Sequence, residues 1–214
     1  MDYQVVVFVM EIIGTIAFAA SGAMVGVEKK MDIFGVAVLG VVTAVGGGII
    51  RDIVLGIIPP GVFQKGVYAA VASVTSFVVF LIAYYKKEIL SSEFRTTYDR
   101  LMLLMDSVGL GIFTAVGVNT GIRHGFLDNT FLLVFLGTIT GVGGGLLRDM
   151  MASVPPYIFF RHIYACASIV GAAVCVFVYR AAGLLPAMLA SSVCVMLIRF
   201  LAAHYRWNLP SAKL

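Results

Sequence analysis

Two apolar stretches of the sequence each contain an arginine followed directly by an aspartate. The first is AVGGGIIRDIVLGIIPP, residues 44–60, with Arg51 and Asp52, and the second is GVGGGLLRDMMASVPP, residues 141–156, with Arg148 and Asp149. An unpaired charge inside a membrane costs at least about 2.5–3.5 kcal/mol, so charges in such segments commonly mark ion or substrate pathways. Because carboxylate and carbonyl oxygens also line cation pathways, the pattern points to movement of an ion or small solute across a membrane.

Three consecutive glycines precede each Arg-Asp pair. They are Gly46, Gly47 and Gly48 in the first stretch, and Gly143, Gly144 and Gly145 in the second. A glycine inside a helix costs about 1 kcal/mol relative to alanine, so each triplet predicts a kink or break; close packing of two helices is the alternative. Backbone groups freed at a break must be buried in protein or line a water-filled cavity. The hydroxyls of Thr43 and Thr140, one turn before each triplet, would add oxygen ligands.

The composition is that of an integral membrane protein. Of 214 residues, 61% are hydrophobic and 12% are charged, and the mean hydropathy is +1.03, whereas soluble domains have about 25% charged residues. The net charge of +4 therefore reflects the loops around a membrane and not affinity for nucleic acid. The three cysteines lie in apolar runs without metal-ligand spacing, and no motif of a hydrolase or metalloprotease is visible. We expect no cofactor, no metal and no enzymatic activity.

Seven apolar runs are long enough to cross a bilayer, which requires about 20 apolar residues. They are residues 5–27, 33–58, 67–85, 101–122, 131–151, 163–180 and 184–204. The first run exceeds the hydrophobic region of a signal peptide, which has about 7–15 residues, so we expect an uncleaved first helix. The predicted fold is an all-α integral membrane protein with seven transmembrane helices.

The first six spans form two repeats of three. EIIGTIAFAASGAMVG (11–26) aligns with DSVGLGIFTAVGVNTG (106–121) at an offset of 95 residues, and the glycine triplets and Arg-Asp pairs align at an offset of 97. Tandem prolines align at an offset of 96, and Tyr68 and Tyr164 follow at the same offset. Because three is odd, the second repeat is inverted in the membrane, and the seventh helix stands outside the repeat. The predicted units are residues 1–85 (first repeat), 86–100 (charged cytoplasmic connector), 101–180 (second repeat) and 181–214 (seventh helix and C-terminal tail).

Lysines and arginines are distributed unequally between the two sides of the membrane. With alternating spans, nine lie on one side, three lie on the other and three lie within spans. The larger group marks the cytoplasmic side, and it consists of Lys29, Lys30, Lys86, Lys87, Arg95, Arg100, Arg161, Arg206 and Lys213. The sequence thus predicts a multi-pass protein of the cell (inner or plasma) membrane, with its N-terminus outside and its C-terminus in the cytoplasm.

Each repeat also carries an acid at the depth of its arginine. The expected ion pairs are Glu11 with Arg51 and Asp106 with Arg148. Asp52 and Asp149 follow their arginines directly, and adjacent helical residues point about 100° apart. We therefore expect these two aspartates to face a neighbouring helix or water. Alternatively, each arginine and its acid form a purely structural ion pair that holds two helices together.

Glycines spaced four residues apart recur in the helices of both repeats. They are Gly22 and Gly26, Gly117 and Gly121, and Gly137 and Gly141. This spacing allows two helices to approach closely, so we expect these glycines to serve helix packing or an oligomer contact.

Seven spans arranged as three plus three inverted plus one, with GGG before Arg-Asp in each half, resemble the trimeric intracellular cation (TRIC) channel family over essentially the whole chain. The small size is similar to that of bacterial and archaeal members. The resemblance implies a homotrimer in membrane lipid, in which each protomer holds a pore for monovalent cations such as potassium, built around the kinked second and fifth spans. Animal members are gated through a basic residue in the fourth span, and residues 101–122 contain none, so that gating does not carry over.

Two functions remain open from the sequence. The first is a potassium-type channel in which Arg51 and Arg148, neutralised by their acids, act as struts whose re-pairing gates the pore. The second is a secondary transporter for a small zwitterion such as glycine, because the same family domain has been associated with glycine transport; an arginine would then bind the substrate carboxylate and an acid its ammonium group. Inverted repeats with interrupted helices are typical of transporters as well as pores.

Overall fold

The computed structural model describes residues 3–85, 92–156, 158 and 163–207, and its regular structure within these residues is helical. Seven of the described helices are long and apolar enough to cross a membrane, which confirms the predicted fold class. They are α1 (Tyr3–Glu28), α2 (Ile33–Val54), α4 (Val67–Tyr85), α5 (Ser92–Arg123), α6 (Thr130–Met151), α8 (Tyr164–Ala182) and α9 (Leu184–His204). A one-turn helix, α3 (Gly61–Gln64), lies between α2 and α4.

Part of the predicted connector and tail lies outside the described residues, namely 86–91 and 208–214. The same holds for Lys86, Lys87, Arg161 and Lys213, four of the charges that predict the orientation. The remainder of the connector is not a loop, because α5 already begins at Ser92.

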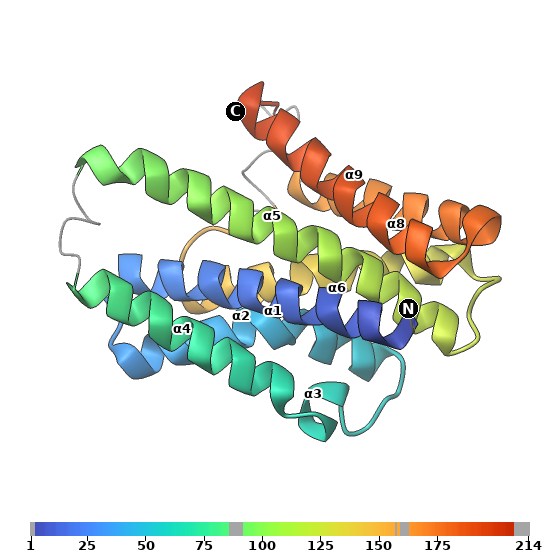
Figure 1. Ribbon diagram of the computed structural model, residues 1–214, viewed down its shortest axis with the longest axis horizontal. Coiled ribbons are helices and arrows are strands. Elements are labelled where there is room, and N and C mark those ends of the chain that lie inside the picture. Colours follow the sequence, from blue (N-terminus) through green and yellow to red (C-terminus); the bar gives the residue numbers. More distant parts are fainter. Residues whose placement is uncertain (1–2, 86–91, 157, 159–162, 208–214) are drawn as a thin grey trace, which may run out of the picture.

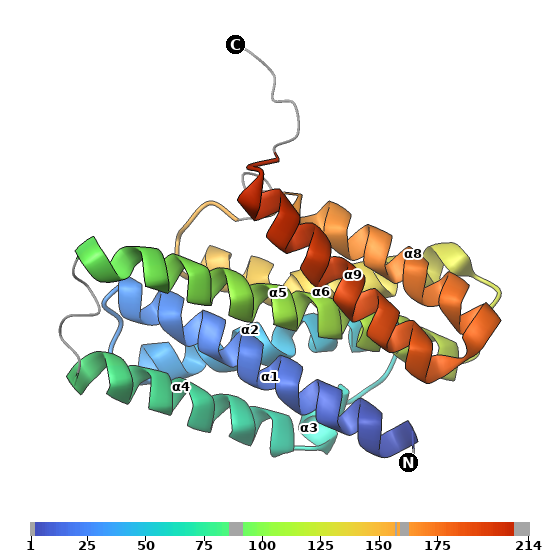
Figure 2. The same cartoon turned by 45° about the horizontal axis from the view of Figure 1, so that its top comes forward.

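The long helices run approximately along the longest axis of the molecule, with α5 between α1 and the α8–α9 pair (Figure 1). α5 is the most enclosed span, with 72% of its apolar stretch buried, and α4 is the least enclosed, with 11%. α4 lies at the edge of the bundle in both views (Figure 2). It therefore presents most of its surface to lipid or to another chain.

The loops gather at two opposite ends of the bundle, because successive long helices alternate in direction (Figure 2). We call one end the N-terminal face; it holds Tyr3, the α2–α4 connection (55–66) and the α5–α6 turn (124–129). We call the other end the C-terminal face; it holds the α1–α2 turn (29–32) and residues 152–156.

α2 and α6 begin in equivalent ways, from opposite faces. The Asp32 side chain accepts a hydrogen bond from the backbone N–H of Gly35 (2.7 Å), and the Asn129 side chain accepts one from Leu132 (3.0 Å). Each thereby caps an otherwise unpaired donor of the first helical turn. The two caps lie 97 residues apart, which is the offset of the glycine triplets.

The two helices also end in equivalent ways. Gly56 follows α2 with φ +71°, and Ser153 follows α6 with φ +53°. In each case the next residue donates its N–H back to the helix, Ile57 to Asp52 (2.8 Å) and Val154 to Asp149 (3.0 Å). This is the left-handed helix ending that glycine favours. The second span consequently stops at Val54, four residues before the predicted boundary.

The glycine triplets do not interrupt their helices. α2 is continuous from Ile33 to Val54, and α6 is continuous from Thr130 to Met151. Neither helix is therefore broken at its triplet, whereas the kink that the triplets predict stays a prediction. The reason is tertiary: the missing side chains let α2 and α6 cross with their backbones in contact, which offsets the low helix propensity of glycine.

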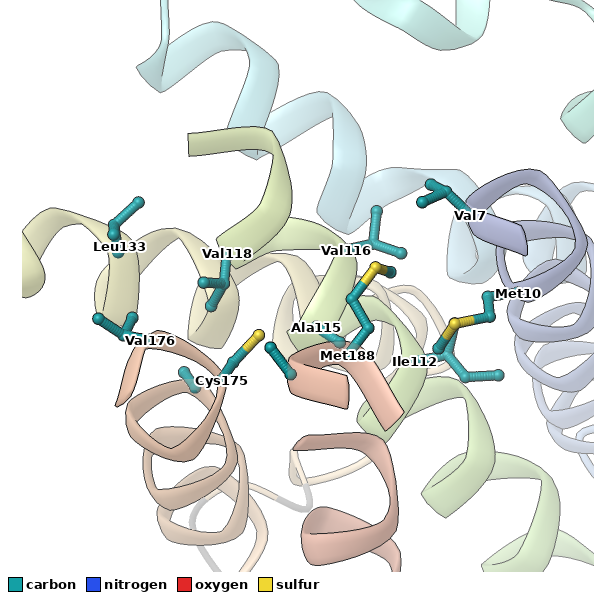
Figure 3. Close-up of a cluster of buried hydrophobic side chains, with 12 residues drawn as sticks. Val7, Met10, Ile112, Ala115, Val116, Val118, Leu133, Cys175, Val176 and Met188 are labelled. Atoms are coloured by element: carbon teal, nitrogen blue, oxygen red, sulfur yellow. The ribbon is translucent and has the colours of Figure 1, made fainter. Parts of the chain in front are cut away.

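The apolar core nearest the N-terminal face joins five helices. Figure 3 shows side chains from α1, α5, α6, α8 and α9 meeting around Met188 and Cys175, which are fully or almost fully buried. Cys175 is a free thiol in this cluster, as expected for an apolar core residue. Val7 and Val116 of the same cluster also line the cavity described next, so this core forms one wall of the cavity.

Candidate functional site

A cavity of about 680 Å³ opens at the N-terminal face. It is bounded by α1, α2, α4 and α5 and reaches inward to Ala44 on α2 and Phe113 on α5. Its charged lining residues are Glu11, Arg51, Asp52, Lys65 and Arg123. Lys65 and Arg123 lie in exposed positions near the mouth, and Arg51 and Asp52 lie deeper and are partly or fully buried.

Four residues form what we call the first cluster: Glu11, Arg51, Asp52 and Tyr68. Arg51 donates to Asp52 Oδ1 from both Nε (2.8 Å) and Nη2 (2.7 Å). The other oxygen of Asp52 accepts the backbone N–H of Gly61 (2.8 Å), which ties α3 to α2. Tyr68 on α4 donates its hydroxyl to Glu11 on α1. These contacts therefore tie α2 to α3 and α1 to α4 around the cavity.

The predicted pairing of Glu11 with Arg51 is wrong. Arg51 pairs with Asp52 (2.7 Å), and within the described residues Glu11 makes no ion pair. Both side chains nevertheless line the same cavity. The long arginine side chain folds back along its own helix, and Tyr68, which the sequence-based pairing did not include, satisfies Glu11.

A second cluster, composed of Asp106, Arg148, Asp149 and Tyr164, lies toward the C-terminal face. The predicted pair of Asp106 with Arg148 is present, with Nη1 2.7 Å from Oδ1. Arg148 Nε also donates to Asp149 (2.8 Å), and Tyr164 donates to Asp106 (3.4 Å). Arg148 further donates to the hydroxyl of Ser21 on α1. All four members of the second cluster are buried, with at most 3% of their surface exposed.

Asp52 and Asp149 pair with the arginines that precede them, which the sequence pattern did not predict, and Asp52 also bonds to Gly61 of α3 and lines the cavity. Each accepts hydrogen bonds from the arginine that precedes it, and each is buried, at 3% and 1% exposure. The rule for adjacent helical residues applies to short side chains. A guanidinium group on a three-carbon stem reaches around the helix to its neighbour.

The two clusters are equivalent members of the repeat. Their acids, arginines, aspartates and tyrosines correspond at offsets of 95 to 97 residues. Tyr68 and Tyr164 are not chemically conspicuous in the sequence, and their shared offset of 96 residues is the signal that identifies them as site residues.

Between the clusters, α2 and α6 cross at their glycines. A Cβ atom on Gly47 would overlap the carbonyl oxygen of Thr140, and a Cβ atom on Gly144 would overlap the carbonyl oxygen of Thr43. A Cβ atom on Gly143 would lie 3.1 Å from the Cα atom of Gly47. No side chain larger than hydrogen fits at this crossing without a backbone shift.

The outer members of the triplets have other surroundings. A Cβ atom on Gly46 would contact Leu147 Cδ1 at 2.5 Å, and one on Gly145 would contact the hydroxyl of Tyr164 at 2.8 Å. Gly48 is open: the nearest atom to its Cβ position is Arg51 Nη2 at 3.8 Å, and the residue lines the cavity.

The hydroxyls of Thr43 and Thr140 do not line the cavity. Each donates to a carbonyl of its own helix, Thr43 to Leu39 (2.6 Å) and Thr140 to Leu136 (2.5 Å). Each also packs against a glycine of the neighbouring helix, the first against Gly22 and the second against Gly117. Gly26 and Gly121 continue these contacts, against Val36 of α2 and Leu133 of α6. The glycines spaced by four thus pack α1 on α2 and α5 on α6.

The clusters differ in their access to water. The Arg51 side chain is 14% exposed within the cavity, whereas the Arg148 side chain is 0% exposed. Phe18 and Phe113, whose ring centroids lie 5.3 Å apart, separate them together with the glycine crossing. The cavity is therefore open to the N-terminal face and closed toward the C-terminal face.

One arginine at the second cluster comes from outside the repeat. Arg199 of α9 places Nη2 3.6 Å from Asp106 Oδ2, and its guanidinium carbon lies 4.7 Å from the ring centroid of Tyr164. In the sequence, Arg199 is identifiable only as a charge within a span, because α9 has no repeat partner that would indicate its position. Within the described residues, no group of three histidine, cysteine or acidic side chains has the arrangement of a metal site.

Comparisons with known proteins agree with this architecture. The chain matches the family model described as "Glycine transporter" over residues 8–84 and 103–180. It is 36% identical to the UPF0126 inner membrane protein YadS of Escherichia coli K12 over 210 residues, covering 97% of each chain. It is 38% identical to a UPF0126 membrane protein of Deinococcus radiodurans over 165 residues, which are 76% of this chain and 72% of that protein.

Solved structures of prokaryotic TRIC channels have the same fold. A prokaryotic TRIC channel crystallised in 0.5 M KCl is 30% identical, with a TM-score of 0.85 over 96% of this chain and 100% of that one. The TRIC orthologue from Rhodobacter sphaeroides is also 30% identical, with a TM-score of 0.83 over 94% of this chain and 99% of that one. The chain therefore belongs to the UPF0126 family of prokaryotic multi-pass membrane proteins, with the fold of the TRIC channels.

Proposed function

We propose that each protomer forms a pathway for monovalent cations such as potassium across the inner membrane, and that three protomers assemble as a trimer. The similarity to prokaryotic TRIC cation channels supports this assignment, since identity of 30–33% extends over at least 94% of the chain. The predicted orientation, with the N-terminal face outside, belongs to the same proposal.

The observation that carries the proposal is a single line of contacts along α1. Glu11 belongs to the first cluster, Thr15 lines the cavity, Phe18 lies at the crossing and Ser21 binds Arg148 of the second cluster. These residues follow the three- and four-residue spacing of one helix face and span about 15 Å. One protomer thus places both clusters in series, with the glycine crossing and the Phe18–Phe113 pair between them.

The charges of the first cluster, at the inner part of the cavity, suit a cation. The first cluster holds two carboxylates, Glu11 and Asp52, against the single guanidinium of Arg51. Asp52 neutralises Arg51, which leaves the carboxylate of Glu11 with the Tyr68 hydroxyl as its hydrogen-bond donor. A carboxylate that lines a water-filled cavity raises the local concentration of cations.

Conduction then requires the crossing to open. Separating α2 from α6 at Gly47 and Gly144 would expose the carbonyl oxygens of Thr43 and Thr140 that they cover. Carbonyl oxygens replace part of the hydration shell of a cation in pores. In this mechanism the triplets act as a gate between continuous helices, and not as fixed breaks in them.

The experiment that tests the proposal is chemical block of the cavity. In a variant with the three cysteines replaced by alanine, Val45→Cys places a thiol in the cavity lining, and Ser73→Cys places one on the exposed side of α4. A cationic thiol reagent should reduce potassium flux from proteoliposomes for Val45→Cys and leave it unchanged for Ser73→Cys. Unchanged flux after complete modification of Val45→Cys would contradict a pathway through the cavity.

A second candidate is a carrier for a small zwitterion such as glycine. The family model described as a glycine transporter favours it, and so does the basic lining near the mouth, where Lys65 and Arg123 would attract a carboxylate. Saturable glycine uptake with counterflow, in the absence of uncoupled current, would identify the carrier.

A further inference from the structure

The second cluster contains an arginine that the repeat does not provide. Arg199 lies on α9, outside the residues matched by the family model, yet only 3% of its surface is exposed. It contacts two members of the cluster, Asp106 through its guanidinium (3.6 Å) and Tyr164 through the face of the ring (4.7 Å). Within the described residues, Glu11, the equivalent of Asp106, has no ion pair.

This extra arginine changes the charge balance of the cluster. Among the residues that the structure describes, Asp106 and Asp149 face the two guanidinium groups of Arg148 and Arg199. The first cluster has one guanidinium for two carboxylates, and it is the cluster that opens to the cavity. Charge matching and burial therefore occur together, as expected when a sealed site must not contain an uncompensated charge.

Among the described residues, the members of the second cluster lie close to the helix ends at the C-terminal face. Arg148 lies three residues before the end of α6, Tyr164 is the first residue of α8, and Arg199 lies five residues before the end of α9. All three helix ends belong to the C-terminal face, so water needs to advance by only one or two helical turns to reach the cluster.

We propose that Arg199 is a latch that keeps the second cluster closed to water from the C-terminal face. It holds α9 against α5 through Asp106 and against α8 through Tyr164. Without Arg199, the cluster carries one excess buried negative charge, which favours entry of water and separation of these helix ends. The role of this closure in gating rests on the proposed function, but the closure itself is a property of the fold.

Thiol accessibility tests the latch. In the cysteine-free background, Ser107→Cys and Ser21→Cys are introduced separately as reporters, because both serines are fully buried at the second cluster. Ser107 directly follows Asp106 in the sequence, and Ser21 accepts a hydrogen bond from Arg148. With the intact Arg199, both thiols should react with a small maleimide only after denaturation. Arg199→Gln should raise the labelling rate by at least about tenfold, since the rate follows the population of the open state. Arg199→Lys, which keeps the charge, should restore much of the protection.

Arg180→Gln is the matched control. Arg180 is an exposed arginine of α8 with hydrogen bonds to Leu127 and Thr130 at the N-terminal face (3.0 Å each). Its removal should leave labelling at both reporters unchanged. Unchanged labelling in Arg199→Gln, or an equal increase in Arg180→Gln, would overturn the proposal.

A second variant covers the case in which Arg199→Gln does not fold. Tyr164→Leu removes the aromatic surface beneath Arg199 and should also raise labelling, whereas Tyr164→Phe, which keeps the ring, should raise it less. Equal labelling in these two variants would contradict the latch. Labelling requires no transport, so a failed latch with intact potassium flux would overturn only this inference, and a working latch without flux would overturn only the proposed function.

Discussion

Gly47 of α2 and Gly144 of α6 meet where the two antiparallel helices cross, and a Cβ atom on Gly47 would lie 3.3 Å from the backbone nitrogen of Gly144. The contact is reciprocal, because each glycine also covers a threonine carbonyl of the opposite helix. The crossing joins equivalent points of the two repeats and separates the two charge clusters.

Gly47→Ala should destabilise the protein by about 1–3 kcal/mol, because the added methyl group meets backbone that cannot move without shifting a helix. Gly48→Ala is the matched control one residue away. Its methyl group would lie 3.8 Å from the nearest atom, so stability should stay the same or rise by up to about 1 kcal/mol. Unfolding of the two variants in a denaturant titration provides the comparison, and equal losses would show that the crossing is not tightly packed.

Arg148→Met should destabilise the protein by about 3–5 kcal/mol, because it removes the buried guanidinium group that Asp106 and Asp149 share. Arg51→Met, at the equivalent position of the first repeat, should cost less, because Arg51 is 14% exposed at the cavity and its removal lets cavity water reach Asp52. The measurement is again the free energy of unfolding. Similar costs for the two variants would contradict the difference in hydration between the clusters.

Ser153→Gly should stabilise the protein by about 0.5–1 kcal/mol, because Ser153 ends α6 with a positive φ that glycine adopts without strain. Gly56→Ser, the equivalent change after α2, should lower stability by a similar amount. Both residues lie in turns at the ends of the bundle. Thermal unfolding of the pair checks the prediction, and a change of the same sign in both would refute it.

Glu11→Gln should lower the permeability ratio of potassium to chloride on the order of tenfold, because it removes the carboxylate that concentrates cations in the cavity. Glu28→Gln is the control, since Glu28 lies exposed at the other end of the same helix. Reversal potentials in a potassium chloride gradient measure the ratio. An unaltered ratio in Glu11→Gln would exclude Glu11 from the selectivity of the pathway.

Much of the fold could be predicted from the sequence, because hydrophobic length and an internal repeat are strong signals. The seven spans follow from apolar runs of membrane-spanning length. The pairing of Asp106 with Arg148 follows from their equal depth and the cost of an unpaired charge. The same argument failed for Glu11, because a partly hydrated cavity relaxes the need for an ion pair.

Other features depended on tertiary contacts that the sequence does not encode locally. The glycine triplets suggested broken helices from intrinsic propensity, but the backbone contact between α2 and α6 keeps both helices continuous. Arg199 could not be assigned to the site, because only the packing of α9 on α5 and α8 brings it to Asp106. The kink predicted at each triplet stays a prediction.

Current across a planar bilayer is the most direct test of the central claim, a cation pathway within each protomer. The purified protein would be recorded in asymmetric potassium chloride, with Gly144→Leu as a variant that obstructs the crossing. The account predicts discrete current steps that reverse near the potassium equilibrium potential and are lost in the variant. A silent bilayer, together with saturable glycine uptake by proteoliposomes from the same preparation, would contradict it and identify a carrier.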